Sequence, residues 1–148
     1  CFMTDDKRKA AHQYLLNFFE AEDSLDAEKL ANFLTPEGVL RFANNPPVTG
    51  QEEITKHFKF TFDNVFQTMK HTIVYFDVLP DKIYVSHELT CVVKGDSEQK
   101  SSKIPIVNVF WKKENEDKST RLEVYMDPTP VFERMKEVNA ANGKKETN

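Results

Sequence analysis

The segment Arg121-Leu122-Glu123-Val124-Tyr125-Met126-Asp127, closed by Pro128, has the pattern of a β-strand. Its apolar and polar residues alternate with period two, so one set faces a helix layer and the other faces away from it. If the apolar set lies in the core, the polar set is in water. If Tyr125 and Asp127 point inward, they form the polar floor of a small-molecule cavity. We expect the second arrangement, with the odd-numbered residues inside.

Three helices are expected before this strand. The first begins at Thr4 or Asp5 and has one apolar stripe, formed by Ala11, Tyr14, Leu15, Phe18 and Phe19. The second begins near Asp26 and places Leu30, Phe33 and Leu34 on its apolar side. The third follows Thr49-Gly50-Gln51-Glu52, which has the pattern of a capping box, and carries Ile54, Phe58, Phe62, Val65 and Phe66.

The remaining chain is expected to form strands. A short one covers Val39 to Phe42, between the second and third helices; the longer ones run from about Met69 to Val78, Ile83 to Lys94, Lys103 to Lys113 and Thr120 to Asp127. Strands joined by short turns are antiparallel, so the order predicts an α+β fold. We expect one domain over residues 4–137, a helical turn or two at Val131 to Val138, and a disordered tail at 138–148.

Composition excludes several classes of protein. Charged residues make up 30% of the 148 residues and the net charge is −4, which argues against a nucleic-acid-binding face. The apolar runs are too short to span a membrane. Cys1 and Cys91 have no metal-type spacing, and we interpret residues 1–3 as an expression remnant with the start at Met3. One remaining thiol suits a reducing compartment, and we expect a cytoplasmic protein without cofactor or metal.

This order of elements resembles the SnoaL-like families of the NTF2-like superfamily, whose relatives include ketosteroid isomerase, scytalone dehydratase, limonene epoxide hydrolase and polyketide cyclases. The resemblance covers about Asp6 to Met135. It is carried by Asp26-Ala27-Glu28-Lys29-Leu30, by Pro46-Pro47-Val48-Thr49-Gly50-Gln51-Glu52-Glu53-Ile54 and by Arg121 to Asp127. It implies a cone in which three N-terminal helices pack on a strongly curved, mainly antiparallel sheet. The fold hosts unrelated reactions and non-enzymes alike.

The resemblance also suggests site residues. The base of ketosteroid isomerase falls on Arg41, which cannot act as a base at neutral pH, and its oxyanion carboxyl falls on Asn108, an amide that can still donate a hydrogen bond. Its first-helix Tyr falls near Phe18, with Tyr14 one turn away. By the same count, cavity-facing positions fall on Glu123, Tyr125, Asp127, His71, His87, Leu89 and Cys91.

Asp127 is our candidate general base, because desolvation at the mouth of the cone raises a carboxyl pKa toward the working range. The alternative is an Asp that closes a turn before Pro128. His71 is the candidate acid or orienting group, or else a structural histidine. Asn108 and Tyr125 are the candidate oxyanion donors, although a Tyr at such a position is often a core residue.

Arg41 is expected inside, where it needs a carboxylate such as Asp127 or Glu123; it is a surface residue if its strand is shifted by one. His87 can face either way, and His57 and His12 are interpreted as rim or solvated residues. The remaining candidate substrate contacts are core residues or cavity walls: Tyr14, Phe18, Phe58, Phe62, Leu89 and Phe110.

The sequence thus favours a cofactor-free enzyme that uses general acid–base catalysis on a small, apolar, oxygenated molecule of polyketide or terpenoid type. An isomerase, a cyclase, a dehydratase and an epoxide hydrolase all fit. The alternative is a non-catalytic ligand-binding or protein-interaction module. We also expect a homodimer through the outer sheet face, where Val107, Val109 and Trp111 are available if Asn108 points inward.

Overall fold

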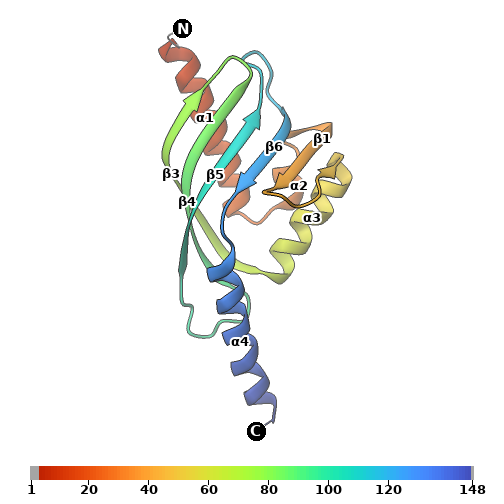
Figure 1. Cartoon of the computed structure of the whole chain (residues 1–148), viewed down its shortest axis with the longest axis vertical. Helices are drawn as coiled ribbons and strands as arrows, with labels where there is room; N and C mark the ends of the chain where they lie inside the picture. Colours follow the sequence, from red (N-terminus) through yellow and green to blue (C-terminus); the bar gives the residue numbers. More distant parts are fainter. Residues whose placement is uncertain (1–3, 148) are drawn as a thin grey trace.

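The computed structural model describes residues 4–147, so the remnant expected at residues 1–3 lies outside it. Within that range the chain forms an α+β fold with one six-stranded sheet (Figure 1). The helices are α1 (Asp5–Asp23), α2 (Ala27–Ala31), α3 (Gln51–Asn64) and α4 (Thr129–Thr147). The strands are β1 (Leu34–Phe42), β2 (Val48–Thr49), β3 (Phe66–Val78), β4 (Lys82–Val93), β5 (Ser102–Trp111) and β6 (Ser119–Tyr125).

The sheet has the order β2-β1-β6-β5-β4-β3. All neighbouring pairs are antiparallel except β1 and β6, which are parallel. The predicted class, with three N-terminal helices against a curved and mainly antiparallel sheet, is confirmed (Figure 1). Because β3 is at the end of the order, one side of its backbone has no strand partner.

The helices begin where their caps predict, with one exception. Thr4 caps α1 by accepting from the Lys7 amide, and Asp26 caps α2 by accepting from the Lys29 amide. The predicted capping box at Thr49 is wrong, because the residue before α3 is Gly50, which makes no side-chain cap. Its φ of 92° lies in the region that glycine adopts without steric cost, so the chain turns sharply from β2 into α3.

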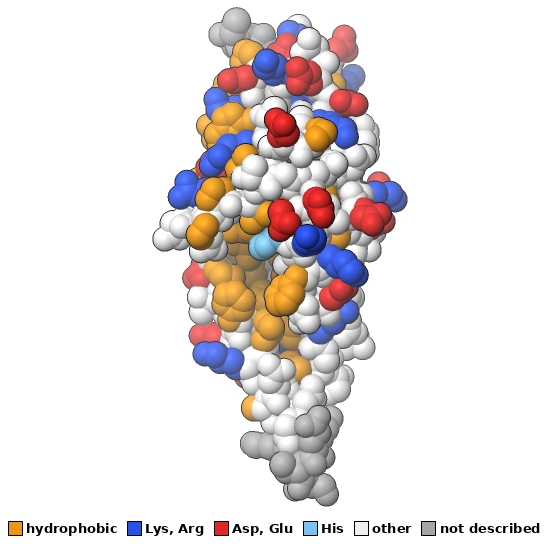
Figure 2. Space-filling model, turned by 90° about the vertical axis from the view of Figure 1, so that its right-hand side faces the viewer, with side chains coloured by type: hydrophobic (Ala, Val, Ile, Leu, Met, Phe, Trp, Pro, Cys, Tyr) orange, Lys and Arg blue, Asp and Glu red, His pale blue; other side chains and the backbone are white. Residues whose placement is uncertain are grey.

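The core lies between the helices and the concave face of the sheet and consists of packed side chains. All five stripe residues of α1 are buried, and so are Ile54, Phe58 and Phe62 of α3. The sheet contributes alternate residues, including Ile83, Val85, Leu89 and Cys91 of β4 and Ile104, Ile106 and Phe110 of β5. Apolar side chains also line a hollow on the surface that α3 borders (Figure 2).

The C-terminal segment differs from the prediction. Residues 138–148 were expected to be a disordered tail after one or two turns, but α4 continues to Thr147. Val131 and Val138 anchor it with buried side chains, and Arg134 donates to both carboxylate oxygens of Asp96 at 2.8 and 2.7 Å. This bidentate pair joins α4 to the loop between β4 and β5. The prediction missed these contacts because the segment is mostly polar.

Candidate functional site

The ring of His71 on β3 lies between two carboxylates at the C-terminal end of α1. Its Nδ1 is 2.6 Å from Asp23 Oδ1, and its Nε2 is 2.6 Å from Glu22 Oε1. The backbone N–H of His71 also donates to both oxygens of Asp23, at 3.0 and 3.3 Å. The side chain of His71 is buried, while those of Glu22 and Asp23 are mostly buried. We call these three residues the Glu22–His71–Asp23 triad.

The triad carries a fixed charge. Burial alone would lower the pKa of His71, but the charge of Glu22 and the hydrogen bonds that the ring donates to both carboxylates outweigh it and raise this pKa to about 9. For Glu22, burial acts to raise the pKa, but the positive charge of His71 prevails and the pKa is lowered. At neutral pH the triad therefore holds two carboxylates and one imidazolium, a net charge of −1.

A second histidine faces the triad from β4. The His87 ring is 5.4 Å from that of His71, and its side chain is fully buried. Both nitrogens of His87 lack a hydrogen-bond partner, as does Oδ1 of buried Asn108 on β5. Such atoms are rare in folded proteins, because each costs about 1–3 kcal/mol, so they mark a place where a polar group of a ligand or a water belongs.

His87 is neutral at pH 7. Burial, with the charge of His71 acting in the same direction, lowers its pKa to about 4, although Asn108, Glu22 and Asp23 act to raise it. Asn108 is thus close enough to affect the ring, although no hydrogen bond of normal geometry joins them. A neutral imidazole has one N–H donor and one acceptor nitrogen, so His87 can both give a proton to a ligand and accept one.

The Phe19 ring covers both histidines. It is stacked on His71 at 5.1 Å and 17°, and it lies 4.5 Å from the ring of His87. Phe19 therefore packs from α1 against both histidine rings. The site as a whole combines a charged triad, a neutral histidine, an amide and an aromatic cover.

The comparisons with known proteins agree with this fold. A family model described as a SnoaL-like domain matches residues 15–121. The chain belongs to this SnoaL-like family. Similar solved structures include a putative SnoaL-like polyketide cyclase from Jannaschia, with 17% identity, a TM-score of 0.68, and 81% of this chain and 87% of that chain covered. No curated protein matches significantly.

Two other solved structures are described as epoxide hydrolases or related enzymes. SalBIII, described as an epoxide hydrolase/cyclase-like enzyme in pyran ring formation, has 14% identity and a TM-score of 0.68, with 86% of this chain and 96% of that chain covered. An epoxide hydrolase of M. tuberculosis has 11% identity and a TM-score of 0.65, with 90% and 94% covered. At these identities the likeness concerns the fold.

In this SnoaL-like chain the last strand is oriented opposite to our expectation. Leu122 and Val124 are buried, and they pair with Phe110 and Asn108 of β5, which face the interior. Because paired residues share a face, the odd-numbered residues of β6 point outward. The inward placement expected for Glu123, Tyr125 and Asp127 is therefore wrong. Burying two branched apolar side chains is worth more than burying polar ones.

The four polar residues assigned by that parity lie outside the cone. Asp127 is exposed, and it accepts from the N–H and hydroxyl of Thr129 at 3.0 and 2.6 Å, which lowers its pKa. It closes a turn before α4, the alternative that the sequence left open. The hydroxyl of Tyr125 donates to Glu123. Arg41 lies beside Glu123 in the register of β1 and β6, so it is on the outer face and not inside, and its Nε donates to the Asn45 carbonyl at 3.3 Å.

The other candidates are buried, as expected. His71, His87 and Asn108 come together, whereas Leu89, Phe18, Phe58, Phe62 and Phe110 are parts of the apolar core. The hydroxyl of Tyr14 is satisfied by Ser119 at 2.7 Å and by the Phe33 carbonyl at 3.2 Å, so Tyr14 is a core residue. Among the described residues no cluster of His, Cys, Asp and Glu could hold a metal, and no helix is apolar and long enough to span a membrane.

Sequence reasoning missed Glu22, Asp23 and Phe19. A signal for the carboxylates was present, because acidic residues at the C-terminal end of a helix oppose its dipole and α1 has no basic residue in its last turn. Such carboxylates need a cation from elsewhere. Phe19 looked like an ordinary member of the apolar stripe, and only the structure places it over two histidines.

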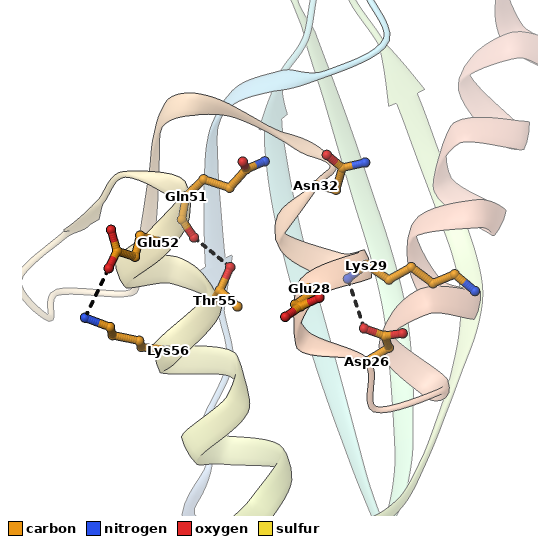
Figure 3. A pocket seen from close by; sticks show the side chains of 8 residues that line it. All are labelled: Asp26, Glu28, Lys29, Asn32, Gln51, Glu52, Thr55 and Lys56. Atoms are coloured by element: carbon orange, nitrogen blue, oxygen red, sulfur yellow. Dashed lines mark hydrogen bonds and ion pairs between the residues drawn. The ribbon is translucent and has the colours of Figure 1, made fainter.

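The groove between α2 and α3 has about 660 Å³ and is lined by charged and amide side chains (Figure 3). Its groups largely pair with each other or with helix ends: Asp26 caps α2, Lys56 pairs with Glu52 at 3.6 Å, and Thr55 donates to the Gln51 carbonyl at 2.7 Å. These are solvated helix termini. We assign no chemistry to this groove.

Because of the triad, we expect the free energy of unfolding to fall as the pH rises into the alkaline range. The pKa of His71 is about 9 in the folded chain and about 6.5 when unfolded, so its contribution is complete below about pH 6.5. It is lost as the pH rises through 9, and the whole change is about 3 kcal/mol from the difference of the two pKa values. Urea unfolding between pH 6 and 10 measures it. A free energy of unfolding that stays constant over this range would show that His71 is not held as an imidazolium between Glu22 and Asp23.

Proposed function

We propose that this chain is an enzyme that moves a proton on a small, largely apolar, oxygenated molecule. His87 is the acid–base group, and Oδ1 of Asn108 beside it accepts a hydrogen bond from a hydroxyl group of the substrate. The observation that carries this proposal is the set of three buried polar atoms without partners, on His87 and Asn108, next to the triad. A site built only for stability would pair these atoms.

The triad explains how so buried a histidine can accept a proton. When His87 takes a proton from a carbon or a hydroxyl, it becomes a cation in an apolar interior, which is costly. The net charge of −1 on the triad, whose His71 ring is 5.4 Å away, offsets part of this cost. Glu22 and Asp23 therefore act as positioning residues through electrostatics, while His87 exchanges the proton and Asn108 contacts the substrate.

A proton transfer of this kind serves several reactions. Removal of a proton next to a carbonyl begins an isomerisation or a dehydration, and removal of a hydroxyl proton prepares an oxygen to open an epoxide or close a ring. The solved structures described as a polyketide cyclase and as epoxide hydrolases share this fold, which supports a substrate of polyketide type. A terpenoid is the other type that the resemblance in the sequence suggests. The proposal includes no cofactor, because His87 itself supplies the acid–base group.

The experiment is a turnover screen with a structural readout. The purified chain is incubated with 1-tetralone in D₂O, with 3-hydroxy-1-tetralone and with limonene 1,2-epoxide, to detect α-proton exchange, loss of water and ring opening. The ¹⁵N resonances of the His87 ring are followed in parallel. Turnover of one compound together with a shift of these resonances supports the proposal. No turnover, with His87 resonances unchanged by every compound, would contradict it.

The second candidate is a non-catalytic binding or scaffold module. It is favoured by the filling of one part of the cone with aromatic rings, since Phe18 lies 4.9 Å from Phe110 and 5.5 Å from Phe33, and Tyr14 lies 5.7 Å from Phe110. These rings leave the polar part near His87 as the place for a ligand. A chain that binds none of the screened compounds belongs to this second class.

We also propose that two copies associate through the outer face of the sheet. Val107 and Tyr84 are 42% and 41% exposed there, near partly exposed Trp111, and exposed apolar groups that lie together are typical of an interface. Val109, expected to contribute, is buried by its neighbours. Replacing Val107 with Arg should convert a dimer to a monomer in light scattering, because it places a charge within the interface.

Val74→Arg is the matched control for this test. Val74 is 70% exposed on the edge strand β3, two strands away from β5, and its replacement should leave the dimer intact. A wild-type chain that is monomeric at the concentration of the assay would contradict the association.

A further inference from the structure

A groove runs along the line where α1 meets the edge strand β3. Its volume is about 680 Å³, which lies within the range of small-molecule sites. Leu16, Phe19 and Asp23 line it from α1, and His71 and Ile73 line it from β3. Since no strand follows β3 in the sheet, nothing from the sheet covers the outer side of this groove.

The groove shares three residues with the candidate site. Phe19, Asp23 and His71 line it, and the same Phe19 ring lies 4.5 Å from the ring of His87. His87 itself is fully buried and does not line the groove. Phe19 is thus in contact with the groove on one side and with His87 on the other, so a rotation of this one ring would join the two.

The structure argues against a peptide as the occupant. An extended peptide would add to the free edge of β3 through backbone hydrogen bonds. The N–H of His71 on that edge is already taken by both oxygens of Asp23, at 3.0 and 3.3 Å. The carboxylate therefore blocks strand addition at the middle of the groove.

The charges of the groove indicate a neutral occupant. Its lining includes the carboxylates of Glu20 and Asp23 and the cations of Lys70 and His71, so the opposite charges of the lining balance. The third carboxylate, Glu22, pairs with His71 at 2.6 Å but does not line the groove. Asp23 and His71 are also engaged with each other at 2.6 Å. Neither an anion nor a cation gains a net attraction there, while Leu16, Phe19 and Ile73 offer apolar contact.

We propose that the α1–β3 groove binds the body of a neutral, largely apolar small molecule, whose oxygen reaches His87 and Asn108 when the Phe19 ring moves aside. This inference rests on the proposed function, because the site at His87 is the destination of the ligand. It assigns Leu16 and Ile73 to substrate binding and makes Phe19 the side chain that controls access.

The test uses 2-naphthol, which is neutral at pH 7 and carries one hydroxyl on an apolar ring system. Its binding is measured by calorimetry and by backbone amide NMR of the full chain. We expect saturable binding with shifts at Leu16, Phe19 and Ile73. Leu16→Trp fills the groove from an exposed position, and it should weaken binding by at least about tenfold, since a filled site excludes the ligand sterically.

Leu79→Trp is the matched control. Leu79 is 45% exposed, compared with 44% for Leu16, but it lines a different groove near Val78 and Ile83. Its replacement should leave the affinity unchanged. Phe19→Leu provides a second measurement, because a smaller side chain should speed the association of 2-naphthol while the circular dichroism spectrum stays the same.

The results separate this inference from the proposed function. Absence of binding, an equal loss in both Trp variants, or shifts confined to other residues would overturn the groove assignment. Turnover in the screen that Leu16→Trp does not affect would also overturn it and leave the proposed function standing. Binding in the groove without any turnover would support the groove and count against the acid–base activity.

Discussion

Replacing His87 with Gln is expected to slow turnover by roughly 10²–10⁴-fold, the usual cost of removing a general acid–base group. Glutamine retains polar atoms of similar reach, but it cannot take up a proton at neutral pH. The fold should persist, because His87 makes no hydrogen bond that the substitution would break. The rate is measured on the compound that the wild-type chain converts, and circular dichroism checks the fold.

His57→Gln is the matched control for His87→Gln. His57 lies on α3 and is only partly buried, and its ring is tilted against that of Phe42 at a distance of 5.2 Å, away from the triad. Its replacement should leave the rate unchanged. If His87→Gln retains full activity while His57→Gln does not, the acid–base group has been assigned to the wrong histidine.

Replacing His71 with Phe should destabilise the chain by about 3–5 kcal/mol, the cost of removing one partner of a buried ion pair. Phenylalanine preserves the stacking on Phe19 but leaves Glu22 and Asp23 side by side without their cation. The free energy of unfolding in urea at pH 6 measures the loss. Activity should fall as well, because the two carboxylates then move or take up protons.

A compensating variant distinguishes charge from packing. Adding Glu22→Gln and Asp23→Asn to His71→Phe removes the unpaired charges, so it should recover part of the lost stability. If instead the three substitutions are additive, the triad contributes through shape and not through charge. The rise in stability from pH 10 to 6 predicted for the wild type should be absent from the compensating variant, in which none of the three positions carries a titratable group.

Much of the fold could be predicted from the regular spacing of apolar residues in the sequence. The stripe of α1 and the alternation of β4 and β5 each place a continuous apolar face on one side, and a one-residue shift would expose all of it. Few chain topologies are compatible with the predicted order of helices and strands. The resemblance to the family placed Asn108 and His87 toward the cavity, although the sequence left the direction of His87 open, and the structure places both inside.

The prediction for β6 was wrong because its polar residues were interpreted as the floor of a ligand site. Leu122 and Val124 obey the ordinary rule that apolar residues face the core, and Asp127 obeys the ordinary rule for a residue that closes a turn. Arg41 then follows β6 to the outer face, because parallel pairing with Glu123 gives both residues the same side. The simpler reading of the alternation was correct.

Only the tertiary structure decided where the chemistry lies. Glu22 and Asp23 are separated from His71 by 48 residues or more, and no local pattern predicts that the end of α1 meets the middle of β3. The sequence by itself determined the class of fold and the buried faces of α1 and α3, because these depend on local periods and burial. Contacts between elements distant in the sequence decide the charge on His71, the neutrality of His87 and the position of Phe19. Such contacts exist only in the folded chain.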